Sequence, residues 1–203
     1  IPGPVLGMLV LLGWLFLRGG ISEDVGRTAD ALLAHFSLLF VPAGVGVMLL
    51  NDDDHVFVGQ RLDSSLEAWQ MPQGGIDPGE DPLATAFREL EEETGITKAV
   101  LIAQTADWHY YDLPDDLVGT IWKGKYCGQC QKWFAMRFTG TEADINIATH
   151  HPEFRSWRWS PIDELASLIV PFKRDLYAAV LGELVPLVAA ARGHGVGDRG
   201  SRG

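Results

Sequence analysis

The segment that most constrains the fold is GGIDPGEDPLATAFRELEEETGI, residues 74–96, because it carries signals for both ends of a helix around a crowded run of glutamates. Asp81 is a favoured residue for the N-cap, and Pro82 suits the first helical turn. Gly95 suits the position just past the last turn, where the backbone often becomes left-handed. The segment therefore predicts a helix from about Pro82 to Thr94.

Two sides of this predicted helix differ in chemistry. Leucine, phenylalanine and threonine recur three or four positions apart and form the side expected to be buried, at Leu83, Phe87, Leu90 and Thr94. Glu89, Glu92 and Glu93 fall together on another side, although like charges at such spacing destabilise a helix. Dense carboxylate oxygens suit Mg²⁺ or Mn²⁺, which would neutralise them. Spacing alone leaves a solvated charged face as the alternative.

Charge and cysteine content limit the function classes. The 203-residue chain has a formal net charge of −11, which argues against non-specific attraction to nucleic acid and predicts no DNA partner. A polyanionic substrate must then be met by local positive charge or by metal. The two cysteines, Cys127 and Cys130, are too few for a disulfide framework and indicate a reducing compartment, so we expect a cytoplasmic protein.

The sequence predicts one central domain, residues 38–190, with strands around the glutamate helix. Apolar runs flank the turn-forming residues 51–54 and predict a hairpin. Further strands are expected at residues 99–104 and 132–138. A later helix should bury a face at helical spacing, formed by Leu176, Val180, Leu184 and Leu187.

The two ends of the chain differ from this domain. Residues 1–37 form an expected extension, and its first 17 residues are apolar and uncharged, which is short for a membrane span and includes prolines and glycines. A membrane anchor or a non-native segment are both open, with the anchor less favoured. Residues 191–203 are Gly-rich and predict a disordered tail.

The glutamate segment resembles the Nudix box, with every fixed position filled. These positions are Gly74, Glu80, Arg88, Glu89, Glu92, Glu93 and Gly95. The resemblance implies an α/β fold, the Nudix αβα sandwich around a mixed β-sheet. It also implies hydrolysis of a nucleoside diphosphate linked to another group.

The resemblance further implies roles for the box residues. Glu89, Glu92 and Glu93 would hold Mg²⁺ or Mn²⁺, two or three ions with substrate bound, with the carbonyl of Gly74 as a further oxygen. The metal would polarise the attacked phosphorus and supply hydroxide near neutral pH. Arg88 lies four residues before Glu92 and would support that carboxylate. Glu92 and Glu93 are thus the catalytic core of the expected site.

Segments outside the box are similar to the Nudix branch that contains RNA 5′-pyrophosphohydrolases and dinucleoside polyphosphate hydrolases. The likeness spans about 140 residues, from Val45 to Leu184, and includes "WQMPQGG", "GQCQKWFAMRFTG", "PEFRSWRW" and "VPFKRDLY". It implies 5′-triphosphorylated RNA or a dinucleoside polyphosphate as substrate. The residues expected to bind it are Arg61, Gln73, Tyr111, Lys132 and Phe154. Lys132 lies in a segment, 117–141, that has no acidic residue, and a plain surface lysine is its alternative; for Tyr111 and Phe154 the alternative to base stacking is a place in the core.

Three positions depart from the pattern of this branch. Val41 stands where an arginine is expected ahead of the first strand. Asp144 occupies the loop position where a glutamate often acts as the base for the attacking water, and Glu142 is the less favoured substitute. Cys130 replaces a basic residue and forms Cys-x-x-Cys with Cys127, which is a weak zinc or redox signal.

Two function classes follow. The first is an enzyme, a Mg²⁺-dependent pyrophosphohydrolase that removes pyrophosphate from 5′-triphosphorylated RNA or, alternatively, splits dinucleoside polyphosphates asymmetrically. The second is a Nudix module that senses a nucleotide without catalysis. A sensor tends to lose ligating carboxylates, and none is missing from the box, so we expect the enzyme.

Overall fold

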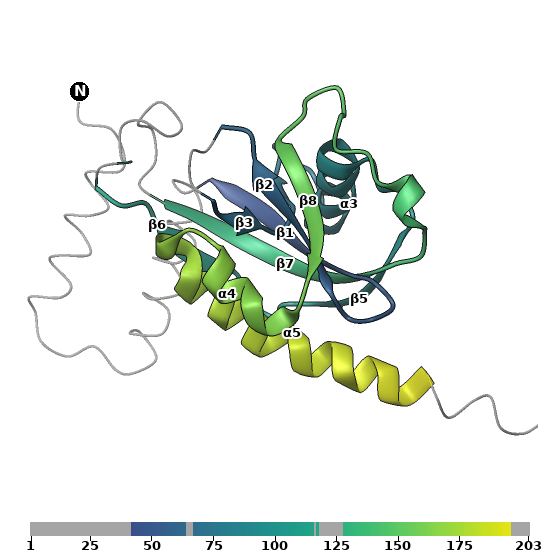
Figure 1. Ribbon diagram of the computed structural model, residues 1–203. Helices are drawn as coiled ribbons and strands as arrows, with labels where there is room; N and C mark the ends of the chain where they lie inside the picture. The colour runs from purple at the N-terminus through teal and green to yellow at the C-terminus, as the bar shows by residue number, and fades with distance from the viewer. Residues whose placement is uncertain (1–41, 64–66, 116, 118–127, 196–203) are drawn as a thin grey trace, which may run out of the picture. The chain divides into compact units, whose positions relative to one another are not determined.

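The computed structural model describes residues 42–63, 67–115, 117 and 128–195 (Figure 1). The predicted extension at residues 1–37, Val41, Cys127 and the last eight residues lie outside this described part.

A mixed sheet of eight strands forms the centre of the domain. Its main path runs in the order β3 (Trp69–Gln70), β2 (Val56–Arg61), β1 (Ala43–Leu50), β7 (Gly128–Phe138) and β5 (Ala99–Gln104). Beside this path, β4 (Gln73–Gly75) pairs with β1, β6 (His109–Asp112) with β7, and β8 (Phe154–Ser160) with β2. β1 and β7 run parallel, whereas β1 and β2 form the predicted antiparallel hairpin. The predicted strand at 99–104 is confirmed, and the one at 132–138 begins earlier, at Gly128.

Helix α3, Pro82–Thr94, has the predicted bounds and caps. Asp81 Oδ1 accepts hydrogen bonds of 3.0 Å from the backbone amides of Leu83 and Ala84, two donors that the first turn leaves without helical partners. Gly95 has a φ of 70° and donates its amide to the carbonyl of Glu91, which ends the helix in the left-handed conformation that glycine tolerates best.

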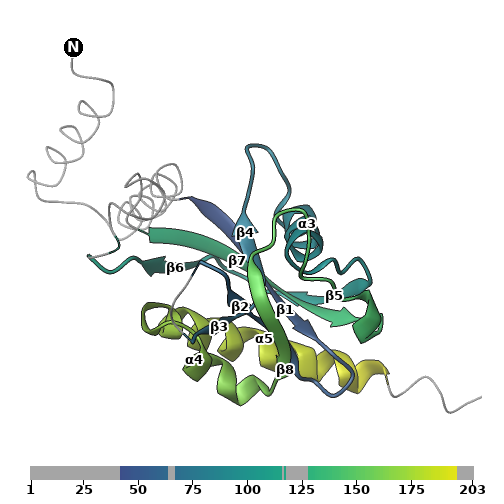
Figure 2. The ribbon, with the colours of Figure 1, turned by 45° about the horizontal axis from the view of Figure 1, so that its top comes forward.

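Hydrophobic clusters cover both faces of the sheet. On one face, Ala86 and Leu90 of α3 pack with side chains of β1, β2 and β7 such as Val47 and Phe134. On the other face, α5 (Arg174–Gly195) and the short α4 (Leu165–Leu168) pack against Met48 and neighbouring residues. Figures 1 and 2 show α3 and α5 on opposite sides of the sheet, which is the expected αβα sandwich.

Helix α5 differs in two details from its prediction. Leu176, Val180 and Leu184 are buried as expected, but Leu187 is 42% exposed and Val188 is buried in its place. The buried positions therefore repeat every four residues, and position 187 falls to the solvent side of this seam. The helix also continues to Gly195, into the segment predicted as a disordered tail.

One helical stretch in the described part of the chain, Pro171–Gly193, is long and apolar enough to cross a membrane. Its residues Tyr177, Val180 and Leu184 are fully buried against the sheet. Core helices of globular domains meet the same length and composition criteria, so this finding does not assign a membrane role.

Candidate active site

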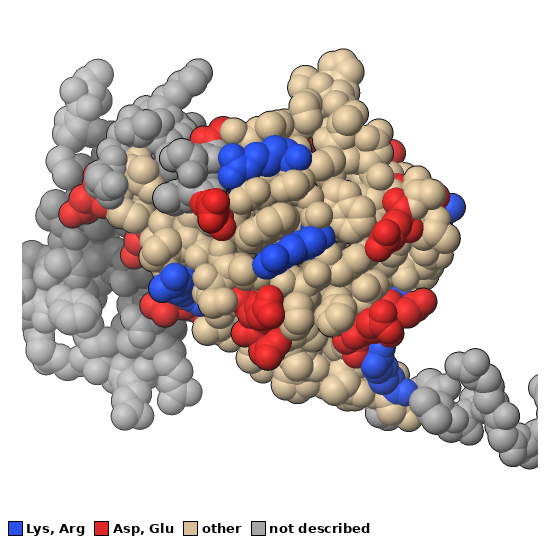
Figure 3. All heavy atoms as spheres, in the orientation of Figure 1, with Lys and Arg blue, Asp and Glu red and all other residues tan. Residues whose placement is uncertain are grey.

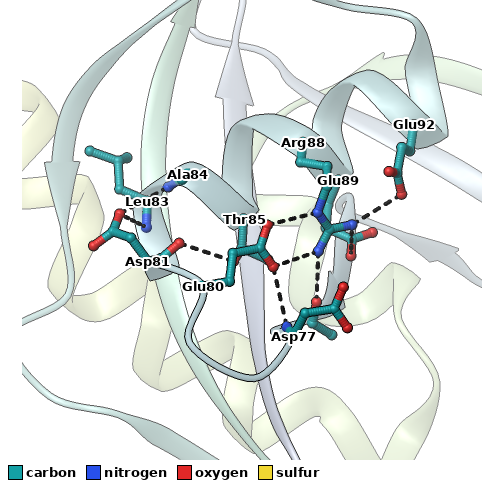
Figure 4. Close-up of polar contacts among 10 residues, drawn as sticks. Asp77, Glu80, Asp81, Leu83, Ala84, Thr85, Arg88, Glu89 and Glu92 are labelled. Carbon is teal, nitrogen blue, oxygen red and sulfur yellow. Dashed lines mark hydrogen bonds and ion pairs between the residues drawn. The ribbon is translucent and has the colours of Figure 1, made fainter.

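Arg88 links the carboxylates at the start and centre of α3 (Figure 4). Its guanidinium donates to both oxygens of Glu80, at 2.8 and 2.9 Å, and to the carbonyl of Gly75 at 3.0 Å. It also donates to Glu89 Oε1 at 2.8 Å and to Glu92 Oε2 at 3.1 Å. The hydrogen bonds from Arg88 lower the pKa of Glu80 to about 2. The structure contains the predicted pairing of Arg88 with Glu92, while a supporting role of Arg88 in catalysis stays a prediction.

The Glu89 carboxylate lies directly on the backbone of Gly74. A Cβ atom at position 74 would overlap the carboxyl carbon and both oxygens of Glu89. Burial raises the pKa of Glu89, although Arg88 acts in the opposite direction. Only glycine at position 74 leaves room for this carboxylate, while the expected role of its carbonyl as a metal ligand stays a prediction.

Glu93 is the most buried carboxylate of the helix, with 2% of its surface exposed. Its Oε2 accepts a 3.2 Å hydrogen bond from the backbone amide of Gln73, and its Oε1 has no partner within the described residues. Burial raises the pKa of Glu93 well above its usual range, and the nearby negative charges of Glu153 and Glu89 raise it further. An unpartnered buried carboxylate is costly unless a cation joins it.

Glu153 is a fourth carboxylate of the site, and the sequence analysis did not select it. It lies immediately before β8, and its Oε2 forms an ion pair with Arg61 Nη1 at 2.9 Å. Its negative charge raises the pKa of both Glu89 and Glu93. The only sequence signal was its place in "PEFRSWRW", a segment that carries the family likeness.

This donor set fits a hard divalent cation. Burial raises the pKa of Glu89 and Glu93, and Glu93 has no ion-pair partner among the described residues. Oxygen-rich sites of this kind suit Mg²⁺ or Mn²⁺. Among the described residues, however, no three Asp, Glu, His or Cys side chains already form a closed ion site. Glu92, whose side chain is 57% exposed, is turned toward Arg88. Substrate phosphate oxygens and carboxylate movement would have to complete the coordination.

Arg61 and Lys173 are two cations whose charges interact with Glu93. Arg61 stays charged between Glu153 and Asp63, where its Nε lies 2.7 Å from Asp63 Oδ1. Lys173, at the end of the 3₁₀ turn Pro171–Lys173, is 7% exposed, and burial lowers its pKa to about 7, assisted by the positive charge of Arg61. Glu93 acts on Lys173 in the opposite direction. A buried lysine close to a metal-type carboxylate site is a suitable anchor for phosphate, and sequence reasoning missed it within "VPFKRDLY".

Glutamines line the sheet beside these cations. Gln131 Nε2 donates to Gln73 Oε1 at 3.1 Å and to Gln129 Oε1 at 3.0 Å, and Gln129 Oε1 also accepts from the Tyr111 hydroxyl at 2.9 Å. Gln70 Nε2 and Gln131 Oε1 are buried without a partner in the described part of the chain. Gln73 thus lies between Glu93 and a surface of glutamine side chains, and its predicted contact with substrate stays a prediction.

The two aromatic residues expected to stack a base are both buried. Phe154 is 2% exposed, and its ring occupies the space that a Cβ at Gly59 would need, so its placement favours the core. Tyr111 is 8% exposed and lies between two neighbours, with Lys173 Nζ 4.7 Å from its ring centroid and the Phe172 ring at 5.9 Å. Tyr111 borders the site, but its ring faces are largely covered.

Lys132 and Asp144 have other partners than those expected. Lys132 Nζ donates to the carbonyl of Ala106 at 2.8 Å, which favours the surface-lysine alternative. Asp144 pairs with Lys98 Nζ at 2.7 Å and accepts from the Thr141 amide at 2.8 Å, and the Lys98 hydrogen bond lowers its pKa. A lowered pKa makes Asp144 a weaker base.

Only one cysteine of the Cys-x-x-Cys pair, Cys130, lies in the part of the chain that the structure describes. Cys130 is buried in β7, its Sγ lies 3.9 Å from the carbonyl of Pro42, and burial raises the pKa of its thiol. Cys127 lies outside the described residues.

Comparison with known proteins agrees with the fold and the box. Residues 41–180 match the NUDIX domain family. The chain is 62% identical to the RNA pyrophosphohydrolase of Roseobacter denitrificans over 139 residues, which cover 68% of this chain and 87% of that protein. It is 60% identical to the RNA pyrophosphohydrolase of Rhodospirillum rubrum over 141 residues, covering 70% and 85% of the two chains. Residues 1–54 also match the LrgA family, which is about a quarter of the chain.

Solved structures share the fold at low sequence identity. A Caenorhabditis elegans Ap4A hydrolase complex aligns with a TM-score of 0.55 at 18% identity, covering 74% of this chain and 99% of that one. The Escherichia coli dihydroneopterin triphosphate pyrophosphohydrolase aligns with a TM-score of 0.54 at 20% identity, covering 70% and 96%.

The αβα sandwich and the capped glutamate helix define a hydrolase of a class that generally uses divalent metal ions. The chain belongs to the Nudix family and is a Nudix hydrolase, a pyrophosphohydrolase by its domain and its relatives.

Proposed function

We propose that this enzyme removes pyrophosphate from 5′-triphosphorylated RNA, with Mg²⁺ or Mn²⁺ held by Glu89, Glu92, Glu93 and Glu153. One observation carries the proposal: Glu93 is buried with no ion-pair partner and an unpartnered Oε1 among the described residues, and the charges of the partly exposed Arg61 and the buried Lys173 act on it. A polyphosphate with bound metal satisfies both halves of this arrangement. Relatives at 52–62% identity are RNA pyrophosphohydrolases, which supports RNA as the substrate.

Each residue would contribute a distinct step. Bound metal would polarise the attacked phosphorus and lower the pKa of the attacking water. Lys173 and Arg61 would hold the phosphate chain and stabilise the charge that develops on the leaving pyrophosphate. Glu153 replaces Asp144 in our proposal as the carboxylate outside the box, since it lies with Glu89 and Glu93 and Asp144 is committed to Lys98. Arg88 would keep Glu89 and Glu92 oriented.

The proposed reaction also suggests how many metal ions bind and where in the cell the enzyme acts. Two or three ions with substrate bound would match the four carboxylates, and a cytoplasmic location would suit an RNA substrate. Asymmetric cleavage of dinucleoside polyphosphates uses the same phosphate chemistry and is the alternative.

A competition assay tests the choice of substrate. Triphosphorylated RNA and diadenosine tetraphosphate are offered together at equal concentration with Mg²⁺, and the release of pyrophosphate and of mononucleotides is followed. We expect RNA to be consumed first, and expect Glu93→Gln to lower kcat on both substrates by about 10³-fold or more. Preferential consumption of the dinucleotide would overturn the RNA assignment, and a Glu93→Gln variant with near-normal turnover would overturn the metal site.

A further inference from the structure

We propose that Gln131 of β7 is a positioning residue for the buried carboxylate Glu93, acting through Gln73 of β4. Gln131 holds the side chain of Gln73, and the backbone amide of Gln73 in turn binds Glu93. The inference rests on the proposed role of Glu93 as a metal ligand and names a residue that keeps this ligand in place.

Sheet register places the two glutamines on one face. Gln131 lies opposite Gly44 in the parallel β1–β7 pair, and Gln73 lies opposite Gly46 in the antiparallel β1–β4 pair. Gly44 and Gly46 are two residues apart, and directly paired residues point to the same side of a sheet, so the two glutamines share a face. A Cβ atom at position 44 would lie 2.6 Å from Gln129 Nε2. The glycines of β1 therefore leave the room in which glutamine side chains from β7 and β4 meet.

Hydrogen bonds hold the Gln73 side chain at both ends of its amide. Gln131 Nε2 donates to Gln73 Oε1 at 3.1 Å, and Gln73 Nε2 donates to Gln70 Oε1 at 3.4 Å. Gln131 is itself fixed, because its Nε2 also donates to Gln129 Oε1 at 3.0 Å, and Gln129 Oε1 accepts from the Tyr111 hydroxyl at 2.9 Å. Strands β6 and β7 therefore restrain Gln73.

Strand β4 passes this restraint to the carboxylates of α3. The backbone amide of Gln73 donates to Glu93 Oε2 at 3.2 Å, which is the one hydrogen bond of the Glu93 side chain within the described residues. The next residue, Gly74, contacts the carboxylate of Glu89, where a Cβ atom would overlap it. Because β4 is only three residues long, a shift of Gln73 should move the groups that touch both carboxylates.

The glutamine network is buried and contains unused polar atoms. Gln70, Gln129 and Gln131 are buried, and Gln70 Nε2 and Gln131 Oε1 have no partner in the described part of the chain. A buried amide that lacks part of its hydrogen bonds stabilises a fold less than apolar packing does, which favours a role in positioning. Figure 3 shows charged side chains spread over the surface in view, whereas these amides are buried, so Gln131 acts through its hydrogen bonds and not through surface charge.

Backbone pairing is the competing explanation for the placement of β4, since all three of its residues pair with β1. If this pairing suffices, the amide of Gln73 stays on Glu93 whatever residue stands at position 131. If Gln131 positions β4, its loss loosens the hydrogen bond between Gln73 and Glu93 and weakens metal binding.

The test uses single variants of the full chain. Gln131→Met removes the amide and keeps a similar side-chain length, and Gln73→Met removes the amide that Gln131 holds but keeps the backbone amide on Glu93. Gln104→Met is the matched control, because Gln104 is an exposed glutamine at the end of β5. NMR measures the hydrogen-exchange protection of the backbone amide at residue 73 in chelator. Steady-state kinetics on triphosphorylated RNA, at varied Mg²⁺ concentration, gives kcat, KM and the Mg²⁺ requirement.

We expect Gln131→Met and Gln73→Met each to lower the protection of this amide about tenfold. Each should also raise the Mg²⁺ concentration for half-maximal activity about tenfold, since groups behind a metal ligand change metal affinity by about 10- to 100-fold. At saturating Mg²⁺, kcat and KM should stay within about threefold of wild type, because the ligands themselves remain. Gln104→Met should match wild type, and Gln73→Met/Gln131→Met should be no worse than either single change, since Gln131 acts through Gln73.

Unchanged protection and an unchanged Mg²⁺ requirement in Gln131→Met would overturn the inference, as would effects that add in the double variant. If Gln131→Met does not fold, Gln73→Met decides, because a normal Mg²⁺ requirement there would show that these side chains do not position Glu93. Near-normal turnover of Glu93→Gln would instead overturn the metal site and the proposed function. Hydrogen exchange in chelator tests the effect of Gln131 on Gln73 independently of that outcome.

Discussion

Helices α3 and α5 cover opposite faces of one sheet but are built differently. The buried face of α5 is apolar, with Val180 and Leu184 fully buried. The buried face of α3 includes Thr85, Thr94 and Glu93, so part of its burial is spent on polar and ionisable groups. Burying an apolar side chain stabilises by about 1.5–3 kcal/mol, whereas burying an unpartnered carboxylate destabilises. Helix α5 therefore stabilises the fold through apolar burial, whereas α3 gives up part of this stabilisation to bury the polar groups of the proposed metal site.

The largest loss of activity is expected from substituting Glu153, the carboxylate that directly precedes β8. Glu153→Gln should lower kcat by about 10²- to 10⁴-fold, because glutamine lacks the negative charge that would bind metal and the basic oxygen that would accept a proton. The matched change, Asp144→Asn, should leave kcat within about threefold of wild type, since Asp144 is paired with Lys98. Steady-state kinetics at saturating Mg²⁺ checks both. The reverse order of effects would restore Asp144 as the base, and a loss confined to Glu142→Gln would point to Glu142.

A substitution on α5 should affect stability and spare catalysis. Leu184→Ala should reduce the free energy of unfolding by about 2–5 kcal/mol, because the side chain is fully buried in the core. Leu187→Ala, one turn away and 42% exposed, should change it by about 0.5 kcal/mol or less. Urea unfolding measures both variants, and kcat at a low temperature should be near normal in each. If Leu187→Ala proved the more damaging, the face assigned to α5 would be wrong.

Arg88→Ala, on α3, should lower activity to an intermediate extent. Arg88 orients Glu89 and Glu92 without contacting the reacting atoms, and such supporting groups typically change metal affinity or activity by about 10- to 100-fold. Activity should recover in part at high Mg²⁺ concentration, because the ligands themselves remain. Titration of activity against Mg²⁺ measures this recovery. If Arg88→Ala lowered kcat as much as Glu153→Gln and Mg²⁺ did not restore activity, Arg88 would contact the reacting groups directly.

The smallest effect is expected from removing the N-terminal extension. A chain beginning at Leu38 should be soluble, folded and as active as the full chain, since the NUDIX match begins at residue 41. Circular dichroism and kcat/KM compare the two chains. Aggregation of the shortened chain beside an active full chain would mean that residues 1–37 belong to the fold.

Local signals predicted α3 well because its determinants are local. The N-cap at Asp81, the left-handed Gly95 and the carboxylate spacing all lie within a few residues of the helix. The site beyond the box depends on contacts between distant segments. Glu153 is 60 residues from Glu93 and reaches it only because β8 pairs with β2, and Lys173 is placed by the turn before α5.

Burial was the property that sequence predicted least reliably. Phe154 has the type of a base-stacking residue, but Gly59, which has no side chain, leaves a space on β2 that its ring fills. Leu187 has helical spacing from Leu184, but the four-residue seam of α5 selects Val188. The burial of Phe154 and the exposure of Leu187 depend on how neighbouring elements pack. The spacing of residues within one strand or helix does not encode this packing.

Thermal unfolding of wild type and Glu93→Gln at pH 8, with chelator and then with Mg²⁺, tests the central claim most directly. Burial raises the pKa of Glu93 well above 4.5, so the stability that its protonated form contributes below pH 4.5 is lost as the pH rises through the raised pKa. With chelator we therefore predict that Glu93→Gln has a Tm several degrees above wild type, since 1 kcal/mol corresponds to about 2–4 °C in a domain of this size.

With Mg²⁺ at about 100 times its dissociation constant, wild type should gain about 2.7 kcal/mol and the variant much less, so that the order of the two Tm values reverses. At pH 4 the two proteins should unfold at similar temperatures. If Mg²⁺ stabilised both proteins equally, or if wild type were the more stable protein in chelator, Glu93 would not be a buried carboxylate kept for metal.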